Sequence, residues 1–282
     1  MIKRIISCVI STVLVLAVTI GYDRTPACRL AVMEQVPPQL GSVLPRAASY
    51  SLELTAEEQS RTYTVNCIGK DGNTFRSYSM LTMEGSEEPL HYTYTDYSYD
   101  EAGNCTEAAT FDKDGQASSA LRRTFDEKNR VLRTENYSEG ELISYSESVY
   151  TEVTNGQSSA VTTLYDADGY EQCIIRTGMN TNGDILSSRL YEGEDNVTAS
   201  TDNRYDSRGR LIQSLSVDEN EIATETLYAY SIDGKRQTSR STCEGETFAT
   251  EQRVFDENDR PLSTIQKDGD GYTISITYSY FS

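Results

Sequence analysis

The stretch Arg204-Tyr205-Asp206-Ser207-Arg208-Gly209-Arg210-Leu211 decides the fold, because its pattern recurs along most of the chain. In the pattern an aromatic residue precedes an aspartate, and a turn-forming residue stands three positions after the aspartate. The full copies are Tyr99-Asp100…Gly103, Phe111-Asp112…Gly115, Phe125-Asp126…Asn129, Tyr165-Asp166…Gly169, Tyr205-Asp206…Gly209 and Phe255-Asp256…Asp259. Together with degenerate copies they follow one another about every 13 residues, close to the spacing of short strands joined by turns.

Each position of the motif has a role in a β-turn. Aspartate at the first position accepts a hydrogen bond from the backbone two residues on. Gly, Asn or Asp at the fourth position tolerates the left-handed conformation that completes a bulged hairpin loop. Between turns the side chains alternate, as in Tyr272–Tyr280, where Tyr and Ile alternate with Thr and Ser in the manner of a pleated strand. The sequence therefore predicts an all-β domain over residues 51–282, an extended antiparallel β-meander of repeated hairpins that forms a sheet or an open shell.

The composition excludes one class of partner. The 282 residues include 44 acidic and 25 basic side chains, which give a formal net charge of −19. Nucleic acid requires clustered Lys and Arg, so we expect no nucleic-acid binding. The chain has 20 tyrosines and no tryptophan, and we expect tyrosine to take the place of aliphatic residues within the strands.

The first fifty residues differ from the rest. Lys3 and Arg4 precede an uncharged apolar run, Ile5–Gly21, which is typical of a signal peptide or, if retained, of an N-terminal anchor. Lipid attachment at Cys28 is a weaker third option. Residues 22–50 are rich in proline and are predicted to form an extended linker. We therefore expect an extracellular protein, secreted or anchored to the outer face of the cytoplasmic membrane, with membrane contact only through the N-terminal segment.

The segment Tyr205–Leu211 resembles the YD repeat of the bacterial RHS family, which centres on Tyr-Asp-x-x-Gly-Arg-Leu. The match is close there, fair at Phe125–Leu132 and Tyr99–Asn104, and loose elsewhere over residues 90–282. The resemblance implies an exported protein whose hairpins build extended or shell-like sheets for surface interaction or toxin packaging. The spacing is shorter than the family repeat, and neither the autoproteolytic Asp-Pro motif nor a toxin domain follows. The expectation is a short, stand-alone YD-repeat-like protein.

No set of residues is typical of catalysis, so we predict that the protein is not an enzyme. His91 is the one histidine, and no Gly-x-Ser-x-Gly elbow accompanies it. Carboxylate pairs such as Asp112/Asp114 lie in turns, whereas a glycosidase needs two carboxylates at a set separation; a glycoside hydrolase is the least favoured alternative. In Asp-x-Asp-Gly the glycine stands at position 4, whereas a calcium-binding loop of the EF-hand type has its glycine at position 6. We therefore expect no cofactor and at most weak Ca²⁺ association.

The cysteines do not indicate a metal site. Cys67, Cys105, Cys173 and Cys243 are widely spaced, without a Cys-x-x-Cys pair, which argues against zinc. Export permits disulfides, and three pairings of these four are open. Isolated, half-buried thiols fit the sequence equally well.

Tyrosine rows are the candidate binding feature, because exposed rings with hydroxyls suit sugars or protein partners. The candidate aromatics are Tyr92, Tyr94, Tyr97, Tyr99, Tyr228 and Tyr230. The alternative is that these rings are the core of a thin sheet. We predict an exported, non-enzymatic β-repeat protein that serves as a cell-surface or extracellular structural or interaction module, with an unknown protein or glycan partner. The alternative function is carbohydrate or cell-wall binding through the tyrosine rows.

Overall fold

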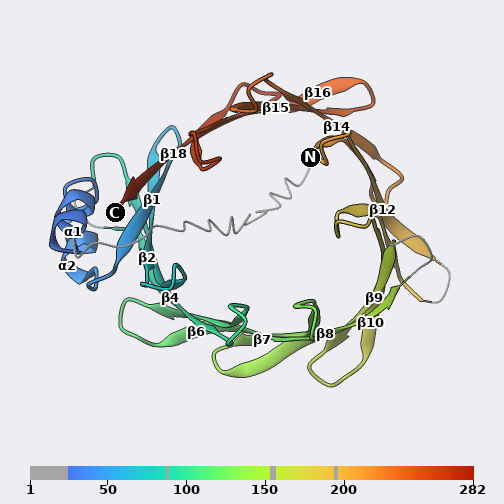
Figure 1. Cartoon of the computed structure of the whole chain (residues 1–282), viewed down its shortest axis with the longest axis horizontal. Helices are drawn as coiled ribbons and strands as arrows, with labels where there is room; N and C mark the ends of the chain where they lie inside the picture. Colours follow the sequence, from blue (N-terminus) through green and yellow to red (C-terminus); the bar gives the residue numbers. More distant parts are fainter. Residues whose placement is uncertain (1–24, 87–88, 153–156, 194–195) are drawn as a thin grey trace.

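The computed structural model describes residues 25–86, 89–152, 157–193 and 196–282, and shows a closed ring of β-strands with two short helices beside it (Figure 1). The helices are α1 (Thr25–Met33) and α2 (Pro38–Val43). The strands are β1 (Ser49–Ala56), β2 (Ser60–Ile68), β3 (Thr74–Met83), β4 (His91–Tyr99), β5 (Cys105–Asp112), β6 (Ala117–Phe125), β7 (Val131–Ser138), β8 (Glu141–Glu152), β9 (Ser158–Asp166), β10 (Glu171–Met179), β11 (Ile185–Tyr191), β12 (Val197–Tyr205), β13 (Leu211–Val217), β14 (Ala223–Tyr230), β15 (Arg236–Cys243), β16 (Glu246–Phe255), β17 (Pro261–Asp268) and β18 (Thr273–Phe281).

The sheet closes on itself. Each strand pairs antiparallel with the next along the chain, and β18 pairs with β1. The register at this seam runs from Tyr50 opposite Phe281 to Ala56 opposite Ser275. The predicted all-β hairpin meander is confirmed, but the expectation of an open sheet or shell is wrong. Closure gives both terminal strands a partner, which removes the exposed edges that an open sheet would carry.

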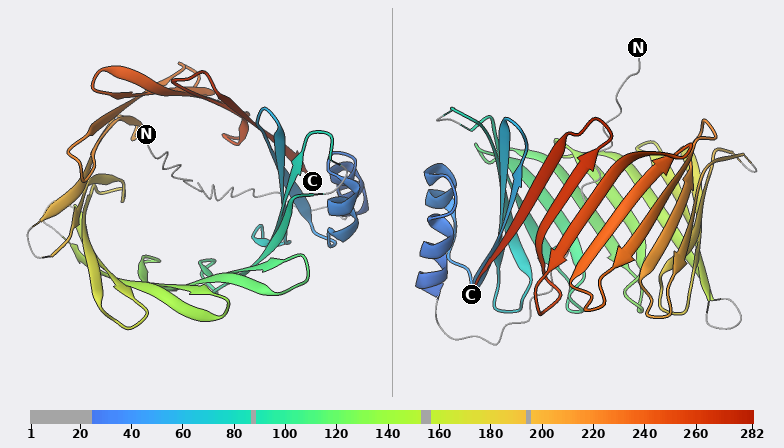
Figure 2. Two further views of the ribbon diagram at one scale, coloured as in Figure 1. Left: turned by 180° about the vertical axis from the view of Figure 1, so that it is seen from behind. Right: turned by 90° about the horizontal axis from the view of Figure 1, so that it is seen from above.

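The ring is too wide for its own side chains to fill. With 18 strands spaced about 4.8 Å apart and tilted by about 40°, the backbone ring is about 35 Å across. A barrel of about eight strands is already just filled by its side chains. Figure 2 shows the inclined strands around the ring, and inward residues such as Thr95 and Thr201 remain partly exposed. The described side chains therefore line a lumen and do not pack it.

The main hydrophobic core lies outside the ring. Helices α1 and α2 stand against one side of the barrel (Figures 1 and 2). The core joins residues of the helical segment to residues of β1–β3: Cys28, Val32, Val36, Leu40, Leu44, Ala47, Tyr50, Leu52, Val65, Cys67, Tyr78 and Met80. Tyr50 and Leu40 are among its fully buried members. The packing of the helices shields part of the strand surface that would otherwise face water.

The helices correct the expectation of an extended linker over residues 22–50. Pro38 lies in the first turn of α2, where the missing N–H costs little, so its presence is compatible with a helix. No helix among the described residues has the length and apolar content needed to cross a membrane. The predicted signal or anchor, residues 1–21, lies outside the described residues.

The core contacts fix which side chains face outward. Tyr50 and Leu52 are buried against the helices, so the alternation along β1 places Ser51 and Glu53 on the opposite face, toward the lumen. Directly paired residues on antiparallel strands share a face, so the strand registers extend this assignment around the ring. We call the two faces the outer wall and the inner wall.

The two ends of the barrel have different turns. Rim A is formed by the turns at 69–73, 100–104, 126–130, 180–184, 206–210, 231–236 and 256–260, and rim B by the opposite turns, including 112–116, 166–170, 218–222 and 268–272. Several tight turns curl toward the lumen in Figure 1. The sequence motif is divided between the rims: Tyr99, Phe125, Tyr205 and Phe255 precede rim A turns, and Phe111 and Tyr165 precede rim B turns.

Candidate functional site

The Asp-initiated turn is a fully hydrogen-bonded unit. Oδ1 of Asp206 accepts the backbone N–H of Arg208 at 2.8 Å and that of Arg210 at 2.9 Å. Its Oδ2 accepts Nε of Arg210 at 2.8 Å, and the backbone N–H of Arg210 is the main group that holds the pKa of Asp206 below its ordinary value. The six predicted copies all lie at hairpin turns, with positive φ at Gly103, Gly115, Asn129, Gly169, Gly209 and Asp259. Their carboxylates are thus engaged in folding the backbone.

In rim A the arginine of the turn also holds a tyrosine of the next hairpin. The guanidinium of Arg210 lies 4.4 Å from the ring centre of Tyr230, and the Tyr230 hydroxyl donates to the carbonyl of Leu211 at 2.9 Å. The same pair of contacts recurs for Arg130 with Tyr150 and for Arg260 with Tyr280. Tyr99 and Tyr205 likewise donate to backbone carbonyls of the preceding hairpin. We call Tyr99, Tyr150, Tyr205, Tyr230 and Tyr280 the clamp tyrosines.

Two of the candidate aromatics face away from the lumen. Tyr92 and Tyr94 lie on the outer wall and pack against the core under the helices. Tyr94 stacks on Phe111 with ring centres 5.0 Å apart, and the guanidinium of Arg76 lies 4.6 Å from the Tyr94 ring. The four tyrosines of β4 therefore do not form one row, because the three-residue step from Tyr94 to Tyr97 reverses the face.

Tyr97, Tyr228 and Tyr278 lie deeper in the inner wall, and we call them the lumenal tyrosines. Each stands two residues before a clamp tyrosine on the same strand. Burial is the main cause that raises the pKa of each hydroxyl above its ordinary value. The rings of Tyr99 and Tyr230 are fixed by their contacts at rim A turns, whereas the lumenal tyrosines have no such contact among the described residues. Of the two tyrosines on each strand, the lumenal one is therefore available to contact a ligand.

Hydroxyl pairs occupy the inner wall between the rims. In four hairpins, directly opposed Thr or Ser side chains are hydrogen-bonded to each other at 2.8–3.1 Å: Thr95 with Thr110, Ser148 with Thr162, Thr201 with Ser216, and Thr226 with Ser241. A hydroxyl donates one hydrogen and accepts at two lone pairs, so each pair keeps further hydrogen-bonding capacity toward the lumen.

One sector of the inner wall carries a cluster of charged groups. On β16, Arg253 and Glu251 are ion-paired at 2.6 Å, and Gln266 of β17 donates to Glu251 at 2.7 Å. Glu53 of β1 lies directly opposite Tyr278 of β18, and burial raises the pKa of Glu53 above its ordinary value. We define the lumenal site as Glu53, Tyr228, Glu251, Arg253, Gln266 and Tyr278. It spans β14–β18 and β1, about 24 Å of wall at the usual strand spacing.

The members of the lumenal site influence one another electrically. After burial, which is the largest cause, Glu251 raises the pKa of Tyr228 and Arg253 lowers it. The pKa of Tyr278, again raised mainly by burial, also responds to Glu53, Arg253 and Glu251. The site thus combines flat rings, fixed acceptors and one guanidinium on a continuous surface.

The outer wall carries charges in the middle of its strands. Arg122 of β6 pairs with Glu107 of β5 at 2.8 Å, and Arg189 of β11 pairs with Asp202 of β12 at 2.8 Å. Arg133 of β7 bridges two carboxylates on β7 and β8. A barrel in contact with lipid presents an apolar band about 25 Å tall on this face, and these charged side chains interrupt any such band.

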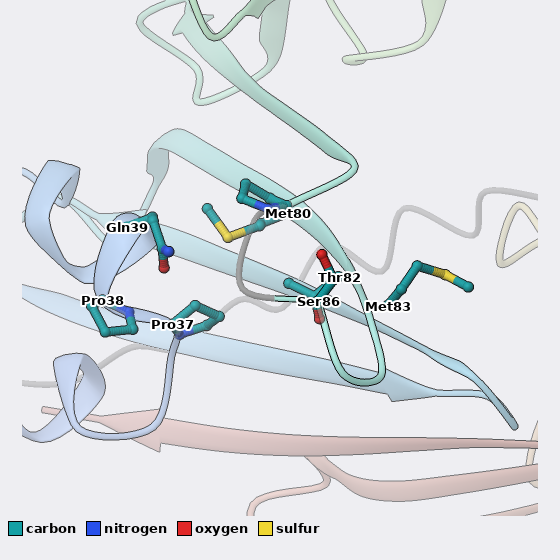
Figure 3. A pocket seen from close by; sticks show the side chains of 8 residues that line it. Pro37, Pro38, Gln39, Met80, Thr82, Met83 and Ser86 are labelled. Carbon is teal, nitrogen blue, oxygen red and sulfur yellow. The ribbon is translucent and has the colours of Figure 1, made fainter.

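A smaller hollow lies outside the ring. It has a volume of about 430 Å³ and lies between the start of α2, strand β3 and the loop that follows β3 (Figure 3). Its lining residues are Pro37, Pro38, Gln39, Met80, Thr82, Met83, Ser86 and Pro89. None of these side chains titrates near neutral pH, so the hollow offers apolar contact and the hydrogen bonds of Gln39, Thr82 and Ser86.

The remaining sequence candidates lie apart. His91 is exposed at the start of β4. Cys67, Cys105, Cys173 and Cys243 lie on four different strands and form no disulfide with each other. Within the described ranges, no group of three or more His, Cys, Asp or Glu side chains is placed to hold a metal ion.

The sequence did not single out Glu53, Glu251, Arg253 or Gln266. Both walls contain polar residues, so alternation alone does not identify the inward face. The usable signal is that Glu251 and Arg253 lie within a strand and not in a turn.

Comparisons with known proteins add only coarse information. No family model matches the chain, and no curated protein matches it in sequence. A solved porin-like protein from Bacteroides uniformis is similar, with 13% identity and a TM-score of 0.44 over 82% of this chain and 96% of that one. A porin-like protein from Bacteroides vulgatus follows with 9% identity and a TM-score of 0.32 over 81% and 97%. A LolA superfamily protein from Nitrosomonas europaea has 14% identity and a TM-score of 0.20 over 82% of both chains. None of them shows a YD-repeat family, and the fold of this chain is an all-β, antiparallel barrel.

Proposed function

We propose that the chain is an exported, non-enzymatic binding barrel of YD-repeat-like hairpins that holds a hydroxyl-rich ligand, an oligosaccharide, against its inner wall. The observation that carries the proposal is the composition of the lumenal site. Tyrosine rings offer flat apolar faces to a sugar, and Glu251, Arg253 and Gln266 supply fixed hydrogen-bonding groups beside them. The hydroxyl pairs continue this character around the wall.

The contrast between the walls supports binding inside the barrel. The outer wall carries exposed apolar side chains such as Val149 and Leu227, but it also carries ion pairs in mid-strand. Lipid contact would bury these charges at about 2–4 kcal/mol for each Arg or Lys at the membrane midplane. We therefore propose that the outer wall faces water and that membrane attachment, where present, is confined to the N-terminal segment. The basic and apolar start of the sequence, Lys3 to Gly21, is the support for export.

The carboxylates of the inner wall support binding without hydrolysis. Glu53 and Glu251 lie on strands separated by β17 and β18, so their backbone positions are about 14 Å apart at the usual strand spacing. Glycosidases hold their two carboxylates about 5–9.5 Å apart. Glu251 is moreover engaged by Arg253 and Gln266, which favours an acceptor over a proton donor.

Ligand titration of the purified protein tests the proposal. With 20 tyrosines and no tryptophan, intrinsic tyrosine emission reports on the rings, and calorimetry supplies the affinity. The probes are neutral cello-, malto- and N-acetylated chito-oligosaccharides. We expect at least one to bind, and we expect Tyr228→Ala and Tyr278→Ala each to weaken binding about tenfold, equivalent to about 1.4 kcal/mol.

The matched control is Tyr137→Ala, which removes a tyrosine from the outer wall, where its ring lies 4.8 Å from the guanidinium of Arg122. This variant is expected to bind as the parent does. If no probe binds, or if all three variants weaken binding equally, ligand binding at the lumenal site is wrong and the structural or interaction module remains. Release of reducing ends from a bound probe would contradict the non-enzymatic part.

A further inference from the structure

We propose that Glu53 makes the lumenal site selective for a protonated primary amine, so that the preferred oligosaccharide is built of amino sugars without N-acetyl groups. The inference rests on the proposed function and names its ligand class more closely. It follows from the position of one carboxylate relative to the cations of the inner wall.

Glu53 has no cationic neighbour in the sheet. It lies directly opposite Tyr278 of β18 on one side and Thr64 of β2 on the other. The inward residues one step along β1 are Ser51 and Thr55, and their hydroxyls are neutral. The four side chains that directly adjoin Glu53 on the inner wall are thus all uncharged.

The inward cations nearest to Glu53 are already paired. Arg260 lies 4.4 Å from the ring centre of Tyr280, two residues beyond Tyr278 on β18. It is ion-paired with Asp256 at 2.7 Å. Arg253 lies on β16, three strands from β1, which is about 14 Å at the usual strand spacing, and it is ion-paired with Glu251 at 2.6 Å. In the other direction the first inward cation is Arg123 on β6, five strands away. Glu53 is therefore a partly buried carboxylate whose charge no described side chain balances at close range.

An ammonium group is the ligand chemistry that fits this position. A cation gains both from the carboxylate and from the face of an adjacent tyrosine ring, here Tyr278. The Ser51 and Thr64 hydroxyls can accept its remaining N–H groups, because an ammonium has three donors to satisfy. A neutral N-acetyl group offers only one N–H and brings a methyl group and a carbonyl, whose oxygen the carboxylate repels.

The experiment compares three probes by calorimetry on the full chain. They are a tetramer of glucosamine, the fully N-acetylated tetramer and spermidine, which carries ammonium groups without a sugar. The variants are Glu53→Gln and, as the matched control, Glu246→Gln, which removes an equal charge from an exposed rim residue. We expect the glucosamine tetramer to bind at least about tenfold more tightly than the acetylated one, and Glu53→Gln alone to abolish that ratio.

The outcomes separate the two proposals. If both tetramers bind equally and Glu53→Gln changes nothing, the amine selectivity is wrong and the proposed function stands. If neither tetramer binds, the amine selectivity is wrong, and the proposed function is then decided by the cello- and malto-oligosaccharide titrations. If spermidine binds as tightly as the glucosamine tetramer and equally depends on Glu53, the amine is recognised without the sugar, which overturns the amino-sugar assignment. If Glu246→Gln weakens binding as much as Glu53→Gln, the attraction comes from the overall negative charge, and the inference is overturned.

Discussion

A single arginine connects three parts of the structure in each clamped turn. Arg210 closes its own turn through Asp206 and covers the ring of Tyr230, and the hydroxyl of that ring holds the carbonyl of Leu211, the residue after the arginine. The motif Asp-x-x-Gly-Arg-Leu therefore contains residues that contact the following hairpin as well as residues that form the turn. Lysine has a point charge without a planar group, so it cannot reproduce both contacts.

Removing this arginine should loosen two hairpins at once. We expect Arg210→Ala to lower the free energy of unfolding by about 1–2 kcal/mol, since a cation–π contact and a charged hydrogen bond are lost. Urea unfolding followed by circular dichroism measures the change. Arg208→Ala, in the same turn but with an exposed side chain, is the control. Equal effects of the two substitutions would contradict the clamp.

Burial of tyrosine predicts instability in alkali. Burial raises the pKa of Tyr99 and of Tyr280 to about 12, whereas an unfolded tyrosine titrates near 10. The folded state then keeps these protons more tightly, so this contribution to stability is complete below pH of about 10 and is lost as the pH rises toward 12. Melting temperatures across this range test it. Tyr280→Phe should reduce the fall in melting temperature between pH of about 10 and 12. An unchanged fall would show that ionisation of Tyr280 does not contribute to the loss of stability.

At the scale of elements, helices α1 and α2 act as an external brace. They cover the outer wall of β1–β3, next to the seam between β1 and β18. The side chains that elsewhere on this wall form ion pairs are here replaced by Val65, Cys67 and Met80. A sheet of this kind has little core of its own, so the helices contribute a large share of the apolar burial.

Truncating the brace should be costly. Leu40 of α2 is fully buried, and we expect Leu40→Ala to lower the free energy of unfolding by about 2–5 kcal/mol through the lost contacts and the cavity left behind. Leu30→Ala in α1 is the control because Leu30 is 61% exposed, and its effect should stay within about 0.5 kcal/mol. Chemical denaturation gives both values. Comparable losses would mean that the helices are not seated on the barrel as described.

The sequence predicted the strands and turns well because their rules are local. An Asp-initiated turn and alternating Tyr/Thr strands depend on a few neighbouring residues, which is why Asp206 and Gly209 could be placed correctly. The helix at Thr25–Met33 was missed because its apolar side matters only once β1–β3 are present to cover it. Tyr94 and Tyr97 could not be assigned to opposite walls, since that needs the direction of the lumen. Closure depends on the pairing of Tyr50 with Phe281, a contact between distant parts of the chain.

At the scale of the whole molecule, the seam is the most demanding feature. Strand β18 has neighbours on both sides, β17 and β1, and joining β1 to β18 brings together residues more than two hundred positions apart. Such long-range closure costs chain entropy. The hydrogen bonds and contacts between β1 and β18 offset this cost only once the ring is complete. The remaining strands of the ring pair with their neighbours in sequence.

Deleting residues 272–282 tests the seam directly. Without β18, strands β1 and β17 each lose a partner and present unpaired edges, which promote association between molecules. We expect a lower melting temperature and larger species in size-exclusion chromatography with light scattering. Glu244→Gly in the exposed two-residue rim turn at 244–245, where Glu244 has a positive φ of 51° that glycine adopts freely, is the control and should leave the protein monodisperse. An unchanged melting temperature after the deletion would contradict the pairing of β18 with β1.

The strictly sequential pairing of hairpins around the ring has a consequence for how such a barrel changes over generations. Each hairpin pairs only with the hairpin before it and the hairpin after it. The same arginine–tyrosine contact recurs at several of these junctions. Duplication or loss of one hairpin would therefore leave every remaining junction intact and alter the girth by two strands. The diameter of the ring is therefore a property that gene rearrangement can change in discrete steps of one hairpin.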